Sequence, residues 1–202
     1  MKRVNIEQLL TDNSMLGQFY DDLDAGVVAI IPTDTLYGFA VAAHLPEAVA
    51  RIYAIKNRDA RKPLILFLNA IEQFAQNGFD LSPDLLPVLQ KHWPGALTAI
   101  LPKPEHQHLG AFSFAKLGVR IPAHEQLLKL LAGYRHKLLT TSANRSGEPS
   151  DCDPDKLAAE FAGEIDWLVD GGVLKPSLPS TVADFTVEPP LILRQGSVRI
   201  VS

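Results

Sequence analysis

Short apolar runs alternate with amphipathic stretches along the chain, which predicts strands and helices in turn. A helix is expected over residues 14–24, with Gly26 as its stop, and Ser82-Pro83 is typical of an N-cap followed by a first-turn proline, starting a helix that reaches residue 92. The other predicted helices cover residues 46–55, 124–132 and 154–162, and the predicted strands cover residues 27–32, 64–68, 96–101, 118–121, 137–141, 167–170, 180–186 and 191–194. This pattern indicates an α/β fold with helices on a large sheet.

The connection between the last two predicted strands bears on how the sheet is built. Residues 180–186 and 191–194 are separated only by the short segment that contains Glu188-Pro189-Pro190. A parallel crossover needs about a dozen residues or more. These strands are therefore expected to run antiparallel, so that the sheet is mixed.

Length and composition fit one globular domain over residues 1–202, with 47% hydrophobic residues and no repeat or linker. The single cysteine, Cys152, cannot form a disulfide within the chain, and residues 1–20 lack the apolar core of a signal peptide. No stretch approaches the roughly 20 apolar residues of a membrane span. A cytoplasmic protein with no membrane partner is expected.

Three segments place hydroxyl side chains beside a predicted strand. Residues 140–144 (Thr-Thr-Ser-Ala-Asn) follow the apolar end of one strand, residues 33–38 follow another, and Ser180-Thr181 begins a third. Hydroxyls and amides donate as well as accept hydrogen bonds, which suits a polar ligand. Each segment taken alone is equally typical of an ordinary turn.

A dense basic run at residues 56–62 stands out in a chain with a formal net charge of −4 and a sequence pI near 5.8. The overall charge argues against a broad nucleic-acid surface. A local cationic patch would serve the phosphates of ATP and of RNA equally well, and a solvated basic loop is the other interpretation. The basic residues within or near such a patch are Arg51, Lys56, Arg58, Arg61, Lys62, Arg120, Arg145 and Arg194.

Two arginines can be interpreted in more than one way from the residues alone. Arg120 could snorkel from its strand or pair with Asp34. Arg194 lies near the end of the chain and could be an ordinary surface residue.

The sequence lacks metal-ligand spacing and the common nucleotide-binding loops. There is no Walker A lysine motif and no Gly-x-Gly-x-x-Gly. Histidines 92, 106, 108, 124 and 136 are scattered, and residues 104–113, which contain two of them, are expected to form an exposed loop. No protein metal site is predicted.

Seven blocks, in order along the chain, resemble the YrdC family, the threonylcarbamoyl-AMP synthases. The blocks are Pro32-Thr33-Asp34-Thr35-Leu36-Tyr37-Gly38, Lys56-Asn57-Arg58 with Lys62, Trp93-Pro94-Gly95-Ala96-Leu97-Thr98, Gly118-Val119-Arg120-Ile121-Pro122, Ser142-Ala143-Asn144, Ser180-Thr181-Val182 and Leu193-Arg194-Gln195-Gly196. Some paralogues lack the lysine/arginine pair and the Ser-Ala-Asn triplet, and this chain keeps both. The resemblance therefore favours the synthase branch.

The resemblance implies a single YrdC-like domain, a twisted mixed sheet flanked by helices with a concave ligand-binding face, without the second C-terminal domain of longer members. It also implies the synthesis of threonylcarbamoyl-adenylate and pyrophosphate from L-threonine, bicarbonate and ATP, for tRNA modification. Mg²⁺ would be held mainly through the ATP phosphates.

The resemblance also assigns roles to residues. Lys56, Arg58 and Lys62 would bind the phosphates, with Lys56 and Arg58 as catalytic residues. Ser142, Asn144 and Arg194 would hold the nucleotide. The residues that would orient threonine are Thr33, Arg120, Ser142 and Ser180, with Arg120 on the α-carboxylate.

Two other functional classes stay open. One is a module that binds double-stranded RNA or tRNA, or acts in ribosome maturation, without synthesis. The other is a regulatory carrier that binds ATP or threonine and turns nothing over. A synthase would also have partner enzymes of tRNA threonylcarbamoylation as acceptors of its product.

Overall fold

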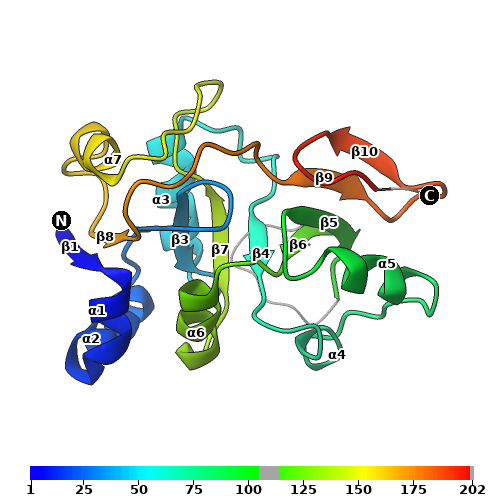
Figure 1. Cartoon of the computed structure of the whole chain (residues 1–202), viewed down its shortest axis with the longest axis horizontal. Helices are drawn as coiled ribbons and strands as arrows, with labels where there is room; N and C mark the ends of the chain where they lie inside the picture. Colours follow the sequence, from blue (N-terminus) through cyan, green and yellow to red (C-terminus); the bar gives the residue numbers. More distant parts are fainter. Residues whose placement is uncertain (105–113, 201–202) are drawn as a thin grey trace.

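The computed structural model describes residues 1–104 and 114–200 and is built on a ten-stranded sheet (Figure 1). The strands are β1 (Lys2–Asn5), β2 (Ala29–Ile31), β3 (Gly38–Ala42), β4 (Ile65–Phe67), β5 (Leu97–Pro102), β6 (Lys116–Arg120), β7 (Leu138–Ser142), β8 (Trp167–Asp170), β9 (Thr181–Asp184) and β10 (Leu191–Arg194). The helices are α1 (Ile6–Thr11), α2 (Asn13–Asp24), α3 (Pro46–Lys56), α4 (Gln73–Gln76), α5 (Leu85–His92), α6 (Glu125–Gly133) and α7 (Pro154–Glu160). None of the helices in these residues has the length and apolarity that a membrane crossing requires.

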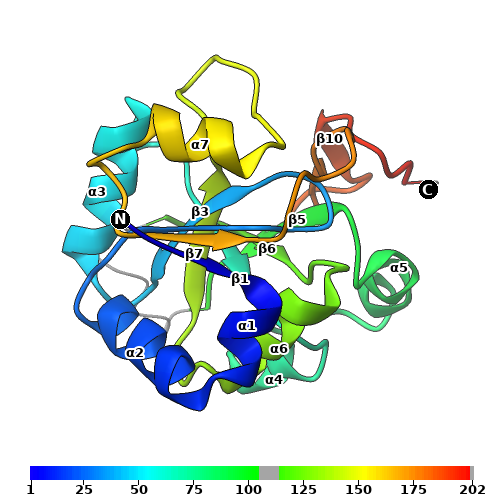
Figure 2. The same cartoon turned by 60° about the vertical axis from the view of Figure 1, so that its left-hand side comes forward.

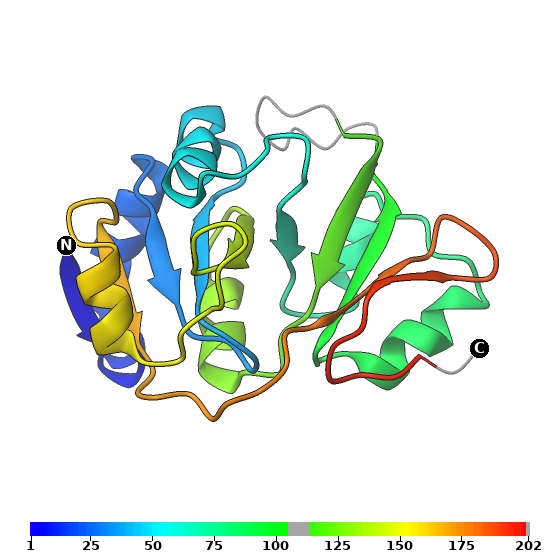
Figure 3. The same cartoon turned by 90° about the horizontal axis from the view of Figure 1, so that it is seen from above.

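The strand order across the sheet is β1-β8-β2-β3-β7-β4-β6-β5-β9-β10. Parallel pairs join β8 to β1 and β2, β4 to β6, and β5 to β9, and the other neighbours are antiparallel. The last two strands pair antiparallel, with Leu191 opposite Asp184. The prediction of a mixed sheet is confirmed, and its two edges lie at opposite ends of the molecule (Figure 3).

Helices cover both faces of the sheet (Figure 2). Ile30 packs in the core on the side of α3 and α7, whereas its neighbours Ala29 and Ile31 pack in a second core with α1, α2 and α6. This division follows from the two-residue period of a strand, which sends successive side chains to opposite faces. Helices α4 and α5 join the first core through Phe74 and Leu89.

The predicted elements are confirmed to within a few residues, with one shift at α5. This helix begins at Leu85 rather than directly after Ser82, because Pro83 and Asp84 form a turn. The Ser82 hydroxyl still accepts a hydrogen bond from the Leu85 amide, at 3.2 Å. The loop expected over residues 104–113 lies, apart from Pro104, outside the described residues.

Four elements are absent from the prediction, namely β1, α1, β3 and α4. Helices α1 and α4 have 6 and 4 residues, which is too short to display a helical period. Strand β3, Gly-Phe-Ala-Val-Ala, is buried at every position and consists largely of residues with weak strand preference. It forms because β2 and β7 supply hydrogen-bond partners on both of its sides.

Beyond β10 the chain folds back onto β9 at Gly196. The Gly196 amide donates to Thr181 Oγ1 at 3.0 Å. A Cβ at position 196 would lie 2.0 Å from the Pro179 carbonyl oxygen and 2.5 Å from the Thr181 nitrogen. Only glycine allows this approach, which holds Arg194 next to Ser180.

We expect Gly196→Ala to lower the free energy of unfolding by about 2 kcal/mol, because the added methyl group meets rigid backbone. Gly17→Ala is the matched control, since a Cβ there has no neighbour within 4 Å and the residue lies inside α2. The control should raise stability by up to about 1 kcal/mol through helix propensity. Urea unfolding followed by circular dichroism measures both, and equal stability of the two variants would contradict the close packing at Gly196.

Candidate active site

A cavity of about 290 Å³ lies over the middle of the sheet. Its walls come from strands β3, β4, β5, β6, β7, β9 and β10 and from the segments that precede β3, β4 and β9. The structure brings six of the predicted site residues to this cavity: Thr33, Arg58, Arg120, Ser142, Ser180 and Arg194. Segments that are far apart in the sequence therefore meet at one site.

Alternation along the central strands makes one face of the sheet polar. Gly118 and Arg120 of β6 line the cavity, while Val119 between them is buried in the core. Thr140 and Ser142 of β7 line the same cavity, and Thr141 between them also reaches it at the end of the strand. Small and hydroxyl-bearing residues on this face leave room for a ligand, and apolar residues on the other face hold the sheet in the core.

Arg120 is the buried charge at the centre of the site, with 4% of its surface exposed. Its guanidinium donates to Asp34 Oδ1 at 2.7 Å, to the Gly95 carbonyl at 3.0 Å and to Thr35 Oγ1 at 3.2 Å. Of the two alternatives that the sequence left open, the structure shows the pairing with Asp34, and the snorkelling alternative is wrong because the side chain stays inside. Burial lowers the pKa of Arg120, and the Asp34 carboxylate opposes that shift.

Three guanidinium groups face the cavity, those of Arg58, Arg120 and Arg194. Arg58 donates to the carbonyls of Lys62 and Pro63 at 3.3 and 3.2 Å. Burial lowers the pKa values of Arg58 and Arg194, and for Arg194 repulsion from the other two arginines adds to the effect. Among the described residues that line the cavity, none carries a carboxylate. The cavity therefore favours an anionic ligand.

Lys56 lies beneath the site rather than in the expected loop. It is the last residue of α3, is only 1% exposed and does not line the cavity. Its ammonium donates to the Ser142 carbonyl at 2.5 Å, to the Asn144 carbonyl at 2.6 Å and to Asn144 Oδ1 at 3.0 Å. The interpretation of this lysine as part of a solvated basic loop is wrong, because α3 ends directly under the end of β7.

Two effects act in opposite directions on the charge of Lys56. Burial, with a smaller contribution from Arg58, lowers the pKa of its ammonium to about 7. The three oxygen acceptors need three hydrogens, which only the charged form has. These contacts favour the ammonium, and an anion in the cavity would favour it further.

The Ser142-Ala143-Asn144 triplet is organised by internal hydrogen bonds. The Ser142 hydroxyl donates to Asn144 Oδ1 at 2.6 Å. The side-chain nitrogen of Asn144, Nδ2, donates to the carbonyls of Arg145 and Glu148 at 2.8 and 2.6 Å. Ser142 lines the cavity and Asn144 does not, so the asparagine shapes the triplet from behind.

The hydroxyls on the opposite wall are also held by neighbours. Ser180 and Thr98 share a hydrogen bond at 2.9 Å, and the Arg194 guanidinium donates to the Ser180 carbonyl at 2.9 Å and to its hydroxyl at 3.2 Å. The Thr33 hydroxyl donates to the Leu36 carbonyl at 2.6 Å. Both walls are thus preorganised around the cavity.

The remaining members of the predicted basic patch do not line the cavity. Lys62 is exposed. Arg51 pairs with Asp166 at 2.9 Å, and Arg61 pairs with Asp59 at 2.8 Å. Arg145 forms an ion pair with Glu164 and stacks on Phe161.

Four threonines line the cavity without an individual role assigned from the sequence, although three of them belong to the hydroxyl-bearing segments described above. They are Thr35, Thr98, Thr140 and Thr141. A usable signal exists for Thr98 and Thr140, because each is a polar residue at a buried position inside a strand. Such positions are normally apolar unless a hydrogen bond or ligand satisfies the hydroxyl.

Comparison with known proteins identifies relatives of this chain. The Sua5/YciO/YrdC family model, described as "Telomere recombination", matches residues 21–196. The threonylcarbamoyl-AMP synthase of Pyrococcus abyssi is 35% identical over 174 residues, which cover 86% of this chain and 51% of the relative. The synthase of Bacillus subtilis is 30% identical over 194 residues, which cover 95% and 56%. This chain thus spans about half the length of these curated relatives.

The fold has a counterpart among solved structures. The crystal structure of P. abyssi Sua5 complexed with L-threonine superimposes with a TM-score of 0.84 at 32% identity. The match covers 98% of this chain and 57% of that chain.

We expect Lys56→Met to lower the free energy of unfolding by about 2–4 kcal/mol, because it removes the three buried hydrogen bonds that the ammonium donates to Ser142 and Asn144. Lys62→Met, a similar change on an exposed side chain of the same run, should change it by less than about 0.5 kcal/mol. Urea titrations of the two variants test the difference. A Lys56 variant as stable as the Lys62 variant would show that the buried contacts of Lys56 are not needed for folding.

Proposed function

The chain belongs to the Sua5/YciO/YrdC family, and we propose that it is a threonylcarbamoyl-AMP synthase that forms threonylcarbamoyl-adenylate from L-threonine, bicarbonate and ATP. The names of the Pyrococcus and Bacillus relatives support the reaction. The Sua5 complex with L-threonine supports the amino-acid substrate. In this reaction the enzyme acts as a nucleotidyltransferase.

The observation that carries the proposal is the set of three guanidiniums around a cavity whose described lining has no carboxylate. Asp34 balances one of them, Arg120, from outside the cavity lining. The excess positive charge suits a triphosphate together with an amino-acid carboxylate. A neutral or cationic substrate would gain nothing from this arrangement.

The chemistry needs positioning more than a protein nucleophile. The threonine amine adds to the carbon of bicarbonate, and loss of water leaves a carbamate. A carbamate oxygen then attacks the α-phosphorus of ATP, and the bond to pyrophosphate breaks. Cationic side chains that hold the phosphates in line and neutralise developing charge lower the barrier of such a transfer.

The nucleotide side of the site would be formed by the cations that no carboxylate neutralises. Arg58 and Arg194 would contact the phosphates directly, since both line the cavity. Lys56 would act from below, by adding charge and by holding Ser142 and Asn144 in place, and Lys62 would reach the phosphates from its exposed position. Mg²⁺ would be held through the phosphates and water, since the described lining offers it no carboxylate.

The threonine side of the site would be centred on Arg120. Its three contacts use three of the five guanidinium hydrogens, which leaves one on each terminal nitrogen within the described structure. These two hydrogens match the two oxygens of an α-carboxylate. Thr33, Ser142 and Ser180 supply hydroxyls around the same cavity.

The synthase proposal is better supported than an RNA-binding module. Arg51, Arg61 and Arg145 belong to the basic patch that RNA would need, and each is paired with a carboxylate. The product would still have to reach tRNA, so partner enzymes of tRNA threonylcarbamoylation are proposed as its acceptors. Cytoplasmic localisation is proposed for the same reason.

The decisive experiment incubates the full chain with ATP, bicarbonate, Mg²⁺ and L-threonine and measures pyrophosphate. Release that requires threonine is the expected result, with reactions lacking threonine or bicarbonate as controls. Binding of ATP and threonine without pyrophosphate would instead favour a regulatory carrier.

We expect Arg58→Ala and Arg194→Ala each to weaken ATP binding by about 10-fold to 150-fold, the equivalent of a charge-assisted hydrogen bond worth about 1.5–3 kcal/mol. Threonine affinity should change little. Lys91→Ala on α5 is the matched control, because this exposed cation lies outside the cavity. Calorimetric titration of each ligand gives the affinities. If the double variant bound ATP as tightly as the wild type, the phosphates would not bind at this site.

We expect Arg120→Lys to raise the threonine requirement about tenfold and to leave ATP affinity within about twofold, because a point charge cannot replace the guanidinium fork. Lysine keeps a positive charge beside Asp34. Arg120→Ala would instead leave the buried Asp34 carboxylate without its ion-pair partner and lower the free energy of unfolding by about 3–5 kcal/mol. Steady-state kinetics with each substrate varied in turn separates the effects. A larger defect toward ATP than toward threonine would place Arg120 on the nucleotide side.

A further inference from the structure

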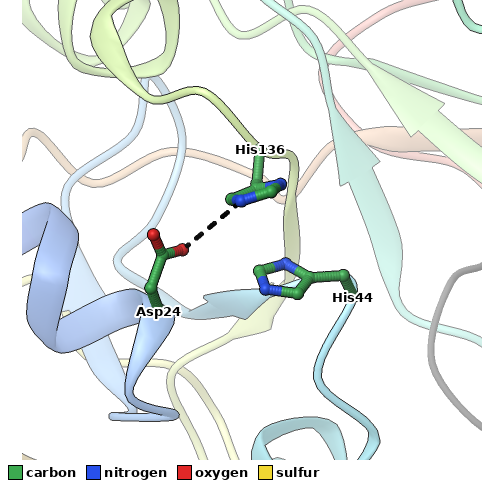
Figure 4. Close-up of side chains that lie close together, drawn as sticks. All are labelled: Asp24, His44 and His136. Carbon is green, nitrogen blue, oxygen red and sulfur yellow. Dashed lines mark ion pairs between the residues drawn. The ribbon is translucent and has the colours of Figure 1, made fainter.

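The side chains of Asp24, His44 and His136 lie close together (Figure 4), and none of the three lines the cavity. Asp24 ends α2, His44 follows β3 and His136 precedes β7. One ligand atom of each side chain lies within 4.8 Å of the others. Three separate elements thus present two imidazoles and a carboxylate to one point.

The side chains of this cluster lie near one another, with ligand atoms farther apart than in an occupied metal site. His136 Nε2 lies 3.9 Å from Asp24 Oδ1, and the rings of His44 and His136 are 4.1 Å apart between centroids. Ligand atoms about 2 Å from a tetrahedral zinc ion lie about 3.3 Å from one another. Small rotations of three side chains would close the difference, and His44 is exposed enough to rotate.

A second layer of contacts orients the carboxylate. The Tyr134 hydroxyl donates to Asp24 Oδ1 at 2.6 Å, and the Tyr134 ring stacks on Tyr20 at 5.3 Å. Carboxylate ligands of metals are commonly held by such hydrogen bonds. Arg135 contacts the other oxygen, Oδ2, at 2.5 Å, but its side chain is 73% exposed and free to move into solvent.

We propose that Asp24, His44 and His136 form a binding site for a divalent transition metal ion, with Zn²⁺ as the preferred ion. Two imidazole nitrogens and one carboxylate oxygen match the ligand preferences of Zn²⁺ and disfavour Mg²⁺ and Ca²⁺, which prefer oxygen. Water would take the fourth position, since His44 is exposed.

The proposed site and the cavity lie at opposite ends of the same two strands. Gly38 pairs with Ser142 at the cavity end, and Ala42 pairs with Leu138 at the end next to the two histidines. Four residue steps along a strand span about 13 Å. An ion here would fasten α2 to both strands and would not take part in chemistry in the cavity.

The test titrates the full chain with ZnCl₂ against a chromophoric chelator and with CoCl₂ by visible spectroscopy. We expect one Zn²⁺ per chain with a Kd at or below about 10 μM, and cobalt absorption bands typical of four-coordinate geometry. His44→Ala and His136→Ala should each weaken Zn²⁺ binding about tenfold or more, and the double variant should abolish it. Zn²⁺ should raise the Tm of the wild-type chain and not that of the double variant.

Two further variants separate this site from adventitious binding. Arg135→Ala should tighten Zn²⁺ binding several-fold, because it removes a competing cation from Asp24. His106→Ala/His108→Ala, a matched pair elsewhere in the sequence, should leave it unchanged. Loss of binding in that control, unchanged binding in the His44/His136 double variant, or a wild-type Kd above about 100 μM would each overturn the proposal. These measurements use no activity assay, so they are independent of the proposed synthase function.

Discussion

The ion pair between Arg120 and Asp34 is the interaction on which the cavity depends. A guanidinium in the middle of a sheet is costly to remove from water, and the cost is met only if the charge and its hydrogens find partners. Those partners come from the segment after β2 and from the Gly95 turn before β5. Arg120 therefore ties two distant loops to β6, and the walls of the site are held where these loops meet.

Several arginines of this protein differ in whether a carboxylate neutralises them. Arg51, Arg61 and Arg145 are matched by carboxylates, which neutralise them. Around the cavity Arg120 is likewise paired with the carboxylate of Asp34, but Arg58 and Arg194 donate to backbone carbonyls. A carbonyl orients a cation without cancelling its charge. An anionic substrate would neutralise the positive charge that remains at the cavity.

The antiparallel pair of β3 and β7 connects the two polar regions of the molecule. At one end it supplies Gly38 and Ser142 to the cavity, and at the other it brings His44 and His136 together. The residues between are buried on both faces, so the two strands form a stiff element. The position of Ser142 above Lys56 depends on this same pair, because its register decides which residues end the strand.

Local pattern in the sequence determined most of the elements, and the resemblance of seven sequence blocks to a known family supplied the candidate site residues. The apolar runs predicted most strands, the short link before residue 191 predicted the antiparallel final pair, and six of the predicted site residues line the cavity. Only the tertiary structure decided which charges are buried and what holds them. Arg120 and Asp34 are 86 residues apart, and Lys56 is 88 residues from Asn144. Burial and partners at such separations depend on how the strands are ordered in the sheet, which no local pattern encodes.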